Sequence, residues 1–201
     1  MKAKIKQLFT EIEQKKNELL KEYETYKKEY HFEILKDKII FPENIKKIHK
    51  KIKVSVPQSV LGATIRTIIS IPFIYMMILP AIILDIFLWC YQQTALRLYS
   101  IPLVKRSDYI VYNRQHLEYL NALEKLNCIY CSYFNGLMGY AVEVAGRTEA
   151  YWCPIKHAKK NNTWHAWQKD FADYGDAKGF RKQYNRTDCF KKIKHPGERN
   201  K

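Results

Sequence analysis

One stretch of the chain, positions 68 to 91, is apolar almost without interruption. Its 24 residues contain a single charged side chain, Asp85. As a helix they would extend about 36 Å, enough to cross the ~30 Å hydrocarbon core of a bilayer. The pattern predicts a membrane segment within residues 59–104. It is either a single span or a re-entrant hairpin, because Pro72 and Pro80 can kink a membrane helix or turn the chain back.

Before this segment, residues 1–58 place apolar and charged side chains at helical spacing. The pattern predicts an amphipathic helix over 3–36, with an apolar stripe of Ile5, Leu8, Phe9, Ile12, Leu19, Tyr23, Tyr26 and Tyr30. After a break at Phe41-Pro42, a second short helix carries isoleucines on one face and lysines on the other. That arrangement is typical of a helix lying at a membrane interface.

After the membrane segment, residues 105–201 are expected to form a small helical domain. Helical spacing predicts one helix over 107–127, begun by Ser107, and another over 133–152. From Lys159 onward the composition predicts short helices and loops. The expected fold class is therefore mainly α, a membrane-anchored helical protein with a small C-terminal helical domain that carries a Cys/His cluster.

The charge of the chain indicates an anionic partner. Lys and Arg number 35 against 20 Asp and Glu, a formal net charge of +15, and fifteen of the basic residues lie within the first 53 positions. Next to a membrane segment, such a basic region favours anionic lipid headgroups. Nucleic acid is an unlikely partner, because no groove-reading motif accompanies the charge. More basic residues flank the segment before it than after it, which predicts a cytoplasmic N-terminus.

The first residues of the chain lead into a charged helical pattern and not into an apolar leader with a cleavage site. The membrane segment is therefore expected to be retained. Asp85 inside it is costly in lipid and is by default a functional candidate. The alternative is a residue at the end of a shorter span, in the headgroups or paired with Arg66 or Arg97.

Three of the five cysteines concentrate in a short stretch together with a histidine. Cys128 and Cys131 form a CxxC motif, and Cys153 and His157 form CxxxH. Together they supply three thiolates and an imidazole, a tetrahedral set for zinc or ligands for an iron centre. Haem attachment is disfavoured, because Ser132 stands where CxxCH needs histidine. The predicted metal ligands are therefore Cys128, Cys131, Cys153 and His157, with zinc or iron as the cofactor.

This metal site requires the chain to fold back between its two halves. One unbroken helix from 131 to 153 would separate the pairs by about 33 Å. Three glycines, at 136, 139 and 146, offer places for a break. An unbroken helix would instead pair with helix 107–127, bringing His116 near Glu143 and Glu149 near Tyr109, with Arg147 neutralising the carboxylates.

Two further interpretations of the cysteines stay open. They form a disulfide or thiol-exchange pair, which requires an exported domain, or they only pack in the interior. Cys90 and Cys189 are expected to be bystanders.

The stretch NCIYCSYFNGLMGYAVEVAGRTEAYWCPIKHA, residues 127–158, resembles the signature of a family of uncharacterised bacterial membrane proteins. The segment IPLVKRSDY, which ends at Tyr109, and the tail motif that begins at Tyr174 resemble it too. The resemblance implies a bacterial origin and an integral membrane protein, so the expected location is the bacterial inner (cytoplasmic) membrane. It assigns no activity and no role to any cysteine or histidine.

Two functions follow from these observations. The first is an integral membrane protein whose C-terminal domain binds a metal through the CxxC/CxxxH cluster, in a structural or redox role. The second is a non-enzymatic membrane-associated scaffold, in which the N-terminal helix binds a protein partner or a second copy of the chain and the cysteines only stabilise the fold. The sequence does not decide whether the protein is an enzyme.

Overall fold

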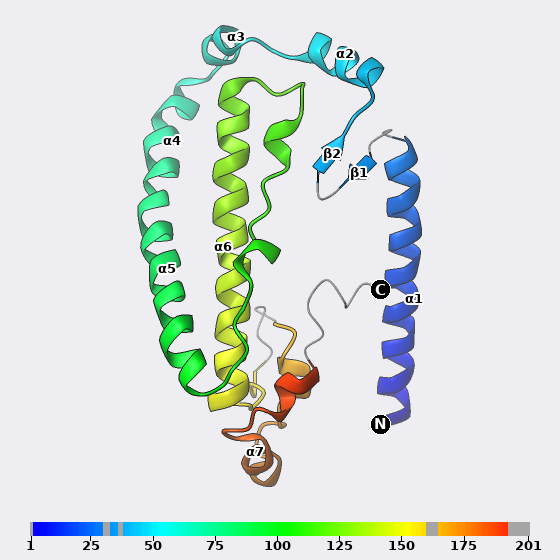
Figure 1. The fold of residues 1–201 in the computed structure, drawn as a ribbon, viewed down its shortest axis with the longest axis vertical. Coiled ribbons are helices and arrows are strands. Elements are labelled where there is room, and N and C mark those ends of the chain that lie inside the picture. The colour runs from blue at the N-terminus through cyan, green and yellow to red at the C-terminus, as the bar shows by residue number, and fades with distance from the viewer. Residues whose placement is uncertain (1, 30–32, 36–37, 160–164, 193–201) are drawn as a thin grey trace. The chain divides into compact units, whose positions relative to one another are not determined.

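The computed structural model describes residues 2–29, 33–35, 38–159 and 165–192. These residues are mainly α-helical, as the sequence predicts. The chain divides into two compact units, one formed by Met1–Gly62 and Asn113–Lys125, the other by Ala63–Tyr112 and Leu126–Lys201. Each unit is described by itself (Figure 1).

The first unit begins with a helix and a short hairpin. Helix α1, Lys2–Glu29, is followed by strands β1, Glu33–Leu35, and β2, Lys38–Ile40, which pair antiparallel with Ile34 opposite Ile39. The long helix predicted over 3–36 is therefore confirmed for most of its length, but its last turns are replaced by strand β1. No strand was expected here.

Two short helices follow in the same unit. Helix α2, Glu43–Ile52, agrees with the short helix predicted after Pro42. Helix α3, Val56–Leu61, begins with a capping box, in which the Ser55 hydroxyl accepts from the Gln58 backbone while the Gln58 side chain accepts from the Ser55 backbone. Asn121, almost fully buried, donates to the Ser59 hydroxyl at 2.8 Å and joins this helix to the later part of the unit.

The second unit contains the apolar segment as one continuous helix. It comprises α4, Ile65–Met76, α5, Ile78–Tyr91, and a π-helical turn η1, Gln92–Leu96. Between α4 and α5 the helix is irregular at Met77, three residues before Pro80. Pro80 has no N–H to donate to the Met76 carbonyl, so the ladder loosens there, but the chain does not reverse. This 32-residue helix, Ile65–Leu96, is long and apolar enough to cross a membrane.

The chain turns back only after Leu96 and then runs along helix α6, Ala122–Trp152, as an extended segment with a 3-10 turn η2 at Arg106–Asp108 (Figure 1). The helix predicted over 107–127 is wrong except for residues 122–127, which are helical as the start of α6. Residues 109–113 are not helical, and Arg114–His116, η3, forms only another 3-10 turn. Asn121 and Glu124 cap the start of helix α6. The Asn121 backbone N–H donates to the Glu124 carboxylate at 2.8 Å, and the Glu124 backbone N–H donates to the Asn121 side-chain oxygen at 3.0 Å.

Helix α6 is unbroken from Ala122 to Trp152, so the helix predicted over 133–152 is confirmed and is longer than expected. Gly136 does not bend it. Instead the extended segment passes so close that a Cβ at 136 would lie 2.7 Å from the Tyr109 carbonyl oxygen and 2.8 Å from the Ile110 Cα. Glycine is required here because the neighbouring atoms belong to the backbone and cannot rotate away.

The C-terminal part of the second unit folds against the end of α6. It contains η4, Gln168–Asp170, helix α7, Ala177–Gln183, and η5, Asp188–Lys192, together with a parallel bridge between Ile155 and Ala172. These short elements agree with the expectation for the tail. The core that they complete includes the buried Leu96, Ile110, Leu137, Tyr140, Val144, Tyr151, Phe171 and Phe190.

The close approach at Gly136 generates a test by substitution. Gly136→Ala is expected to lower the free energy of unfolding by about 1–3 kcal/mol, because the added methyl group overlaps backbone atoms. Gly139→Ala, three residues further along α6, is the matched control, since its Cβ would meet only the Tyr109 ring at 3.4 Å. That variant should be neutral, or more stable by up to about 1 kcal/mol. Thermal unfolding followed by circular dichroism measures both, and equal effects would contradict the packing described.

Candidate functional site

The four predicted metal ligands lie in two separate places. Cys128 and Cys131 are half-buried within helix α6, whereas Cys153 and His157 are exposed beyond its end. The unbroken helix holds Cys131 and Cys153 about 33 Å apart. Among the described residues, no group of three or more His, Cys, Asp or Glu side chains is placed to hold a metal ion.

The structure therefore does not bring together the set Cys128, Cys131, Cys153 and His157. The physical reason is that the glycines of α6 do not break the helix. Gly136 instead lets the extended segment pack closely against it. Gly146 is a second example, since a Cβ there would lie 2.9 Å from the Trp167 ring. Binding of zinc or iron by this chain stays a prediction, without a preformed four-ligand site to support it.

All five cysteines are free. Cys189 is half-buried, and burial raises the pKa of its thiol above the ordinary value, which disfavours the reactive thiolate.

The charged residue inside the apolar helix has a partner that the sequence analysis did not identify. Arg106 donates to both carboxylate oxygens of Asp85, from Nε at 3.0 Å and from Nη2 at 2.6 Å. Tyr133 on α6 donates its hydroxyl to the same carboxylate at 3.1 Å, and the Arg106 guanidinium lies 5.8 Å from the Tyr133 ring centre. The pairing of Asp85 with Arg66 or Arg97 is therefore wrong.

This ion pair joins three elements of the second unit. Asp85 lies on the side of α5 that faces α6, on a stripe of partly or fully buried positions that includes Ile78, Ala81 and Leu88. Arg106 comes from the extended segment. Three donors satisfy the carboxylate, and its charge is neutralised by the partly exposed Arg106 guanidinium.

A second polar group binds the extended segment to the end of the apolar helix. The buried Gln92 donates to the Tyr140 hydroxyl and accepts from the Val104 backbone N–H at 2.6 Å. It lies in the π-helical turn η1, a distortion of the kind often found where one side chain must be redirected.

A third group surrounds Arg147, which is almost fully buried. Its Nε donates to Glu143 at 3.0 Å, and its Nη1 donates to the carbonyl oxygens of Pro102 and Leu103 at 2.7 and 3.0 Å. The expectation that Arg147 neutralises a carboxylate is confirmed for Glu143. The pairing predicted for His116 and Glu143 presupposed a helix over 107–127, but Arg114–His116 forms only a 3-10 turn.

Glu149 pairs with a histidine from the tail and not with Tyr109. His165 Nε2 lies 2.6 Å from the Glu149 Oε2, and both side chains are largely buried. The other ring nitrogen, Nδ1, has no hydrogen-bond partner among the described residues, because it packs against the backbone of α6 at Gly146. The pair therefore attaches the tail to α6.

Sequence reasoning missed Arg106, Gln92, His165 and Tyr133. For Arg106 a signal was present, since it is one of three basic residues, with Arg97 and Lys105, that follow the apolar run. Arg106 follows Asp85 by 21 residues, so it can pair with Asp85 if the chain turns back after the apolar helix. The sequence analysis did not predict that turn.

Comparison with known proteins gave no match among protein-family models, curated proteins or solved structures. The resemblance of residues 127–158 to a family of bacterial membrane proteins therefore rests on its motifs alone.

The ion pair of Asp85 generates a double-mutant test. Arg106→Gln is expected to destabilise the protein by about 1–3 kcal/mol, because it leaves the Asp85 carboxylate of the apolar helix without its cation. Combining it with Asp85→Asn should recover most of that loss, since the charge is then gone from both partners. Thermal unfolding of the two single variants and the double variant measures the coupling. Additive losses would show that the two side chains do not stabilise each other.

Proposed function

We propose that this chain is an integral membrane protein that acts by binding, a membrane-anchored scaffold and not a catalyst. The observation that carries the proposal is the helix Ile65–Leu96. The most apolar 18-residue stretch of this helix has a mean hydropathy of 2.3, and only 6% of that stretch is buried within the protein.

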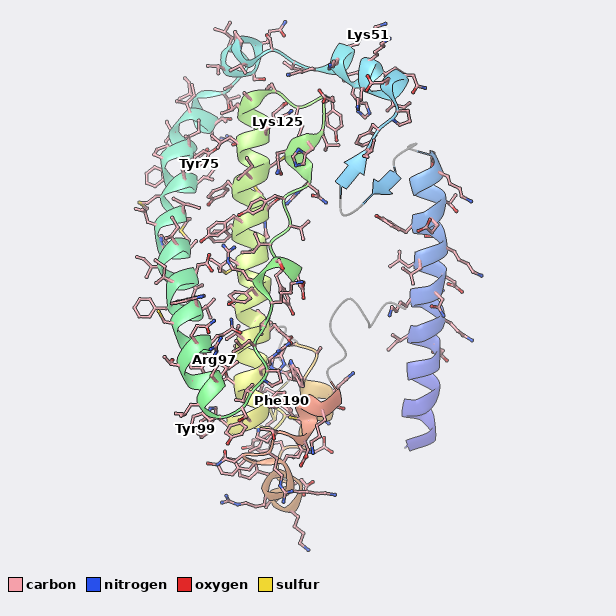
Figure 2. The ribbon with its side chains drawn as sticks, viewed as in Figure 1. Lys51, Tyr75, Arg97, Tyr99, Lys125 and Phe190 are labelled. Carbon is pink, nitrogen blue, oxygen red and sulfur yellow. The ribbon has the colours of Figure 1, made fainter. Side chains whose placement is uncertain are left out.

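The apolar side chains of this helix project outward around most of its circumference (Figure 2). In water such a surface would be costly, and soluble proteins rarely expose an apolar patch of this extent. In a bilayer the same surface is favourable. The exposed residues are Ile65, Ile68, Ile69, Ile71, Phe73, Ile74, Met76, Met77, Leu79, Ile82, Ile83, Leu84, Ile86, Phe87 and Trp89.

The only acidic side chain of the helix supports this placement. Asp85 would oppose insertion as a free carboxylate, but Arg106 and Tyr133 neutralise and bond it on the side that faces α6. Between Ile68 and Trp89 the exposed large side chains of the helix are therefore apolar.

The flanking charges support an orientation with the N-terminus in the cytoplasm. Lysines at 46, 47, 50, 51 and 53 precede the helix, and helix α2 carries exposed Ile48 and Ile52 on its opposite face. Such a helix binds anionic headgroups and the upper acyl region together. After the helix, Arg106 is already neutralised by Asp85, which lowers the positive charge of that flank further.

Helix α1 supplies the binding surface in this proposal. Ile12 and Leu19 are 64% and 65% exposed, lie two turns apart on one face, and are joined there by the half-exposed Tyr23. Lysines and glutamates alternate around that stripe, as in the ion pair of Lys15 and Glu18. A helix with an apolar stripe and both signs of charge complements another copy of itself. We therefore assign α1 of a second copy as its partner.

Membrane extraction tests the anchor. The protein is expected to stay in the membrane pellet in 1 M salt and in alkaline carbonate, and to be released by detergent. A variant with the five lysines 46, 47, 50, 51 and 53 changed to Gln should behave in the same way, because burial of the helix and not surface charge holds the chain. Release of the wild-type chain by carbonate would contradict an embedded helix.

Self-association of the detergent-solubilised protein tests the scaffold. Ile12→Asp and Leu19→Asp are each expected to weaken self-association at least tenfold, because each places an unpaired charge in the apolar contact. Gln14→Asp is the matched control, since Gln14 is exposed on the opposite face of α1. Light scattering after size-exclusion chromatography measures the mass. A monomeric wild-type protein, or equal effects of all three variants, would refute pairing through this stripe.

A further inference from the structure

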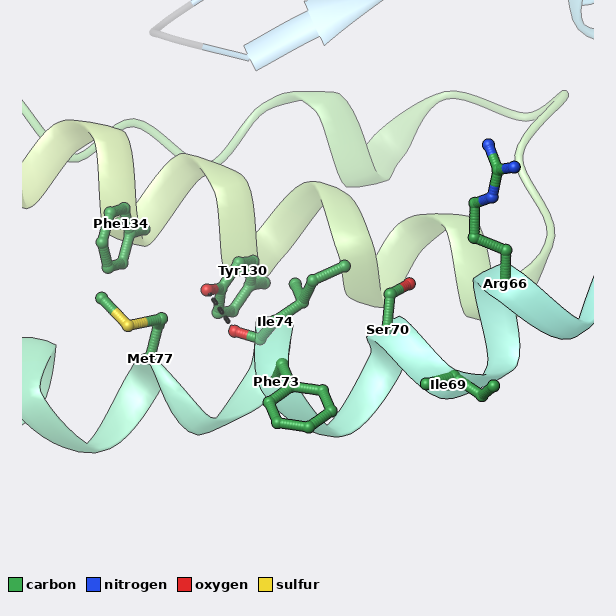
Figure 3. Close-up of a pocket in the computed structure, with 8 residues that line it drawn as sticks. All are labelled: Arg66, Ile69, Ser70, Phe73, Ile74, Met77, Tyr130 and Phe134. Carbon is green, nitrogen blue, oxygen red and sulfur yellow. Dashed lines mark hydrogen bonds between the residues drawn. The ribbon is translucent and has the colours of Figure 1, made fainter.

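A groove of about 890 Å³ runs along the first half of the apolar helix. It lies between α4 and α6, within the second unit, in the size range of ligand sites in proteins. It is lined by Arg66, Ile69, Ser70, Phe73, Ile74, Met77, Tyr130 and Phe134 (Figure 3).

The floor of the groove is rigid and apolar. Tyr130 and Phe134 on α6 stack with an interplanar angle of 20°. The Tyr130 hydroxyl donates to the Ile74 carbonyl at 2.7 Å, and the Ser70 hydroxyl donates to the Thr67 carbonyl at 2.8 Å. Because both polar groups are used within the protein, the groove offers a ligand an almost entirely hydrocarbon surface.

Only one charged side chain lines the groove, and it lies at one end (Figure 3). Arg66 is exposed, and within the described part of the chain it forms no ion pair. It is the second residue of α4, so its guanidinium is at the end of the span, where headgroups lie. A ligand that fits this groove therefore has an anionic end and an apolar remainder.

The length of the groove matches one leaflet of a bilayer. From Arg66 to Met77 the helix rises about 16 Å, and half of a ~30 Å hydrocarbon core is about 15 Å. An acyl chain that starts at the level of Arg66 would end near Met77, the point at which the helical ladder loosens.

We propose that this groove binds one phospholipid with a net negative headgroup, its phosphate at Arg66 and one acyl chain over Tyr130 and Phe134. This inference rests on the proposed membrane function and specifies the lipid that the anchor selects. Charge complementarity at Arg66 gives the preference for an anionic over a zwitterionic headgroup. The bulk bilayer solvates the rest of the helix without such a preference.

Lipid titration of the detergent-purified full chain, followed by native mass spectrometry, tests the proposal. The probes are phosphatidylglycerol and phosphatidylcholine with identical acyl chains. The wild-type chain is expected to bind the first about fivefold more tightly, the gain expected from one arginine at a headgroup. Arg66→Gln should remove this preference, and Arg66→Lys should retain most of it. Ser70→Phe, which fills the groove, should weaken the binding of both lipids.

The matched control is Arg97→Gln, at the other end of the same helix. Arg97 is also exposed and forms no ion pair within the described residues, but it does not line the groove. Its variant should keep the full preference. Equal binding of the two lipids by the wild type, or equal losses in the Arg66 and Arg97 variants, would overturn the proposal. A chain that stays in carbonate-washed membranes but shows no preference refutes this inference alone, whereas a chain released by carbonate refutes the anchor.

Discussion

The continuity of helix α6 is the constraint on which the second unit depends. This one helix contacts the apolar helix through Tyr130, the extended segment at Gly136, and the tail at Gly146. Each contact needs a straight stretch of helix with either a small residue or an aromatic ring at the right turn. A break in it would separate the tail from the apolar helix and the extended segment, which are also joined to each other by Arg106 and Asp85 and by Gln92 and Val104. The same continuity keeps the two cysteine motifs apart.

The sequence predicted those elements whose signal is local. The apolar helix was recognisable from its length, and α2 from isoleucines that recur on one face. The glycines of α6 were misjudged because a glycine that permits close approach and one that breaks a helix look alike in a sequence. The helix predicted over 107–127 failed for a different reason. Asn121 and Glu124, three residues apart, were a readable start signal for α6, but the helical spacing of tyrosines before them outweighed it.

The candidate site was predictable in its residue types but not in its pairings. Asp85 was singled out because a carboxylate in an apolar run needs a partner. The arginine that pairs with Asp85 is set by the way the chain runs back along α6. This is a long-range feature that no local pattern reveals. The same holds for Glu149, whose partner His165 comes from the tail. Within the second unit Arg147 and Glu143 are thus bonded in the interior, while the apolar side chains of α4 and α5 are largely exposed.

The position of Arg106 has a consequence for the order of events during synthesis. It follows Asp85 by 21 residues, so a ribosome adds it about 1 to 4 s later. Under the proposed membrane function, the apolar helix would reach the insertion machinery before its carboxylate has its cation. Insertion at that stage would cost about 3 kcal/mol for the one acidic residue, which the long run of Ile, Leu and Phe around it would offset. The ion pair would then form after insertion and hold the extended segment against a helix already in the bilayer.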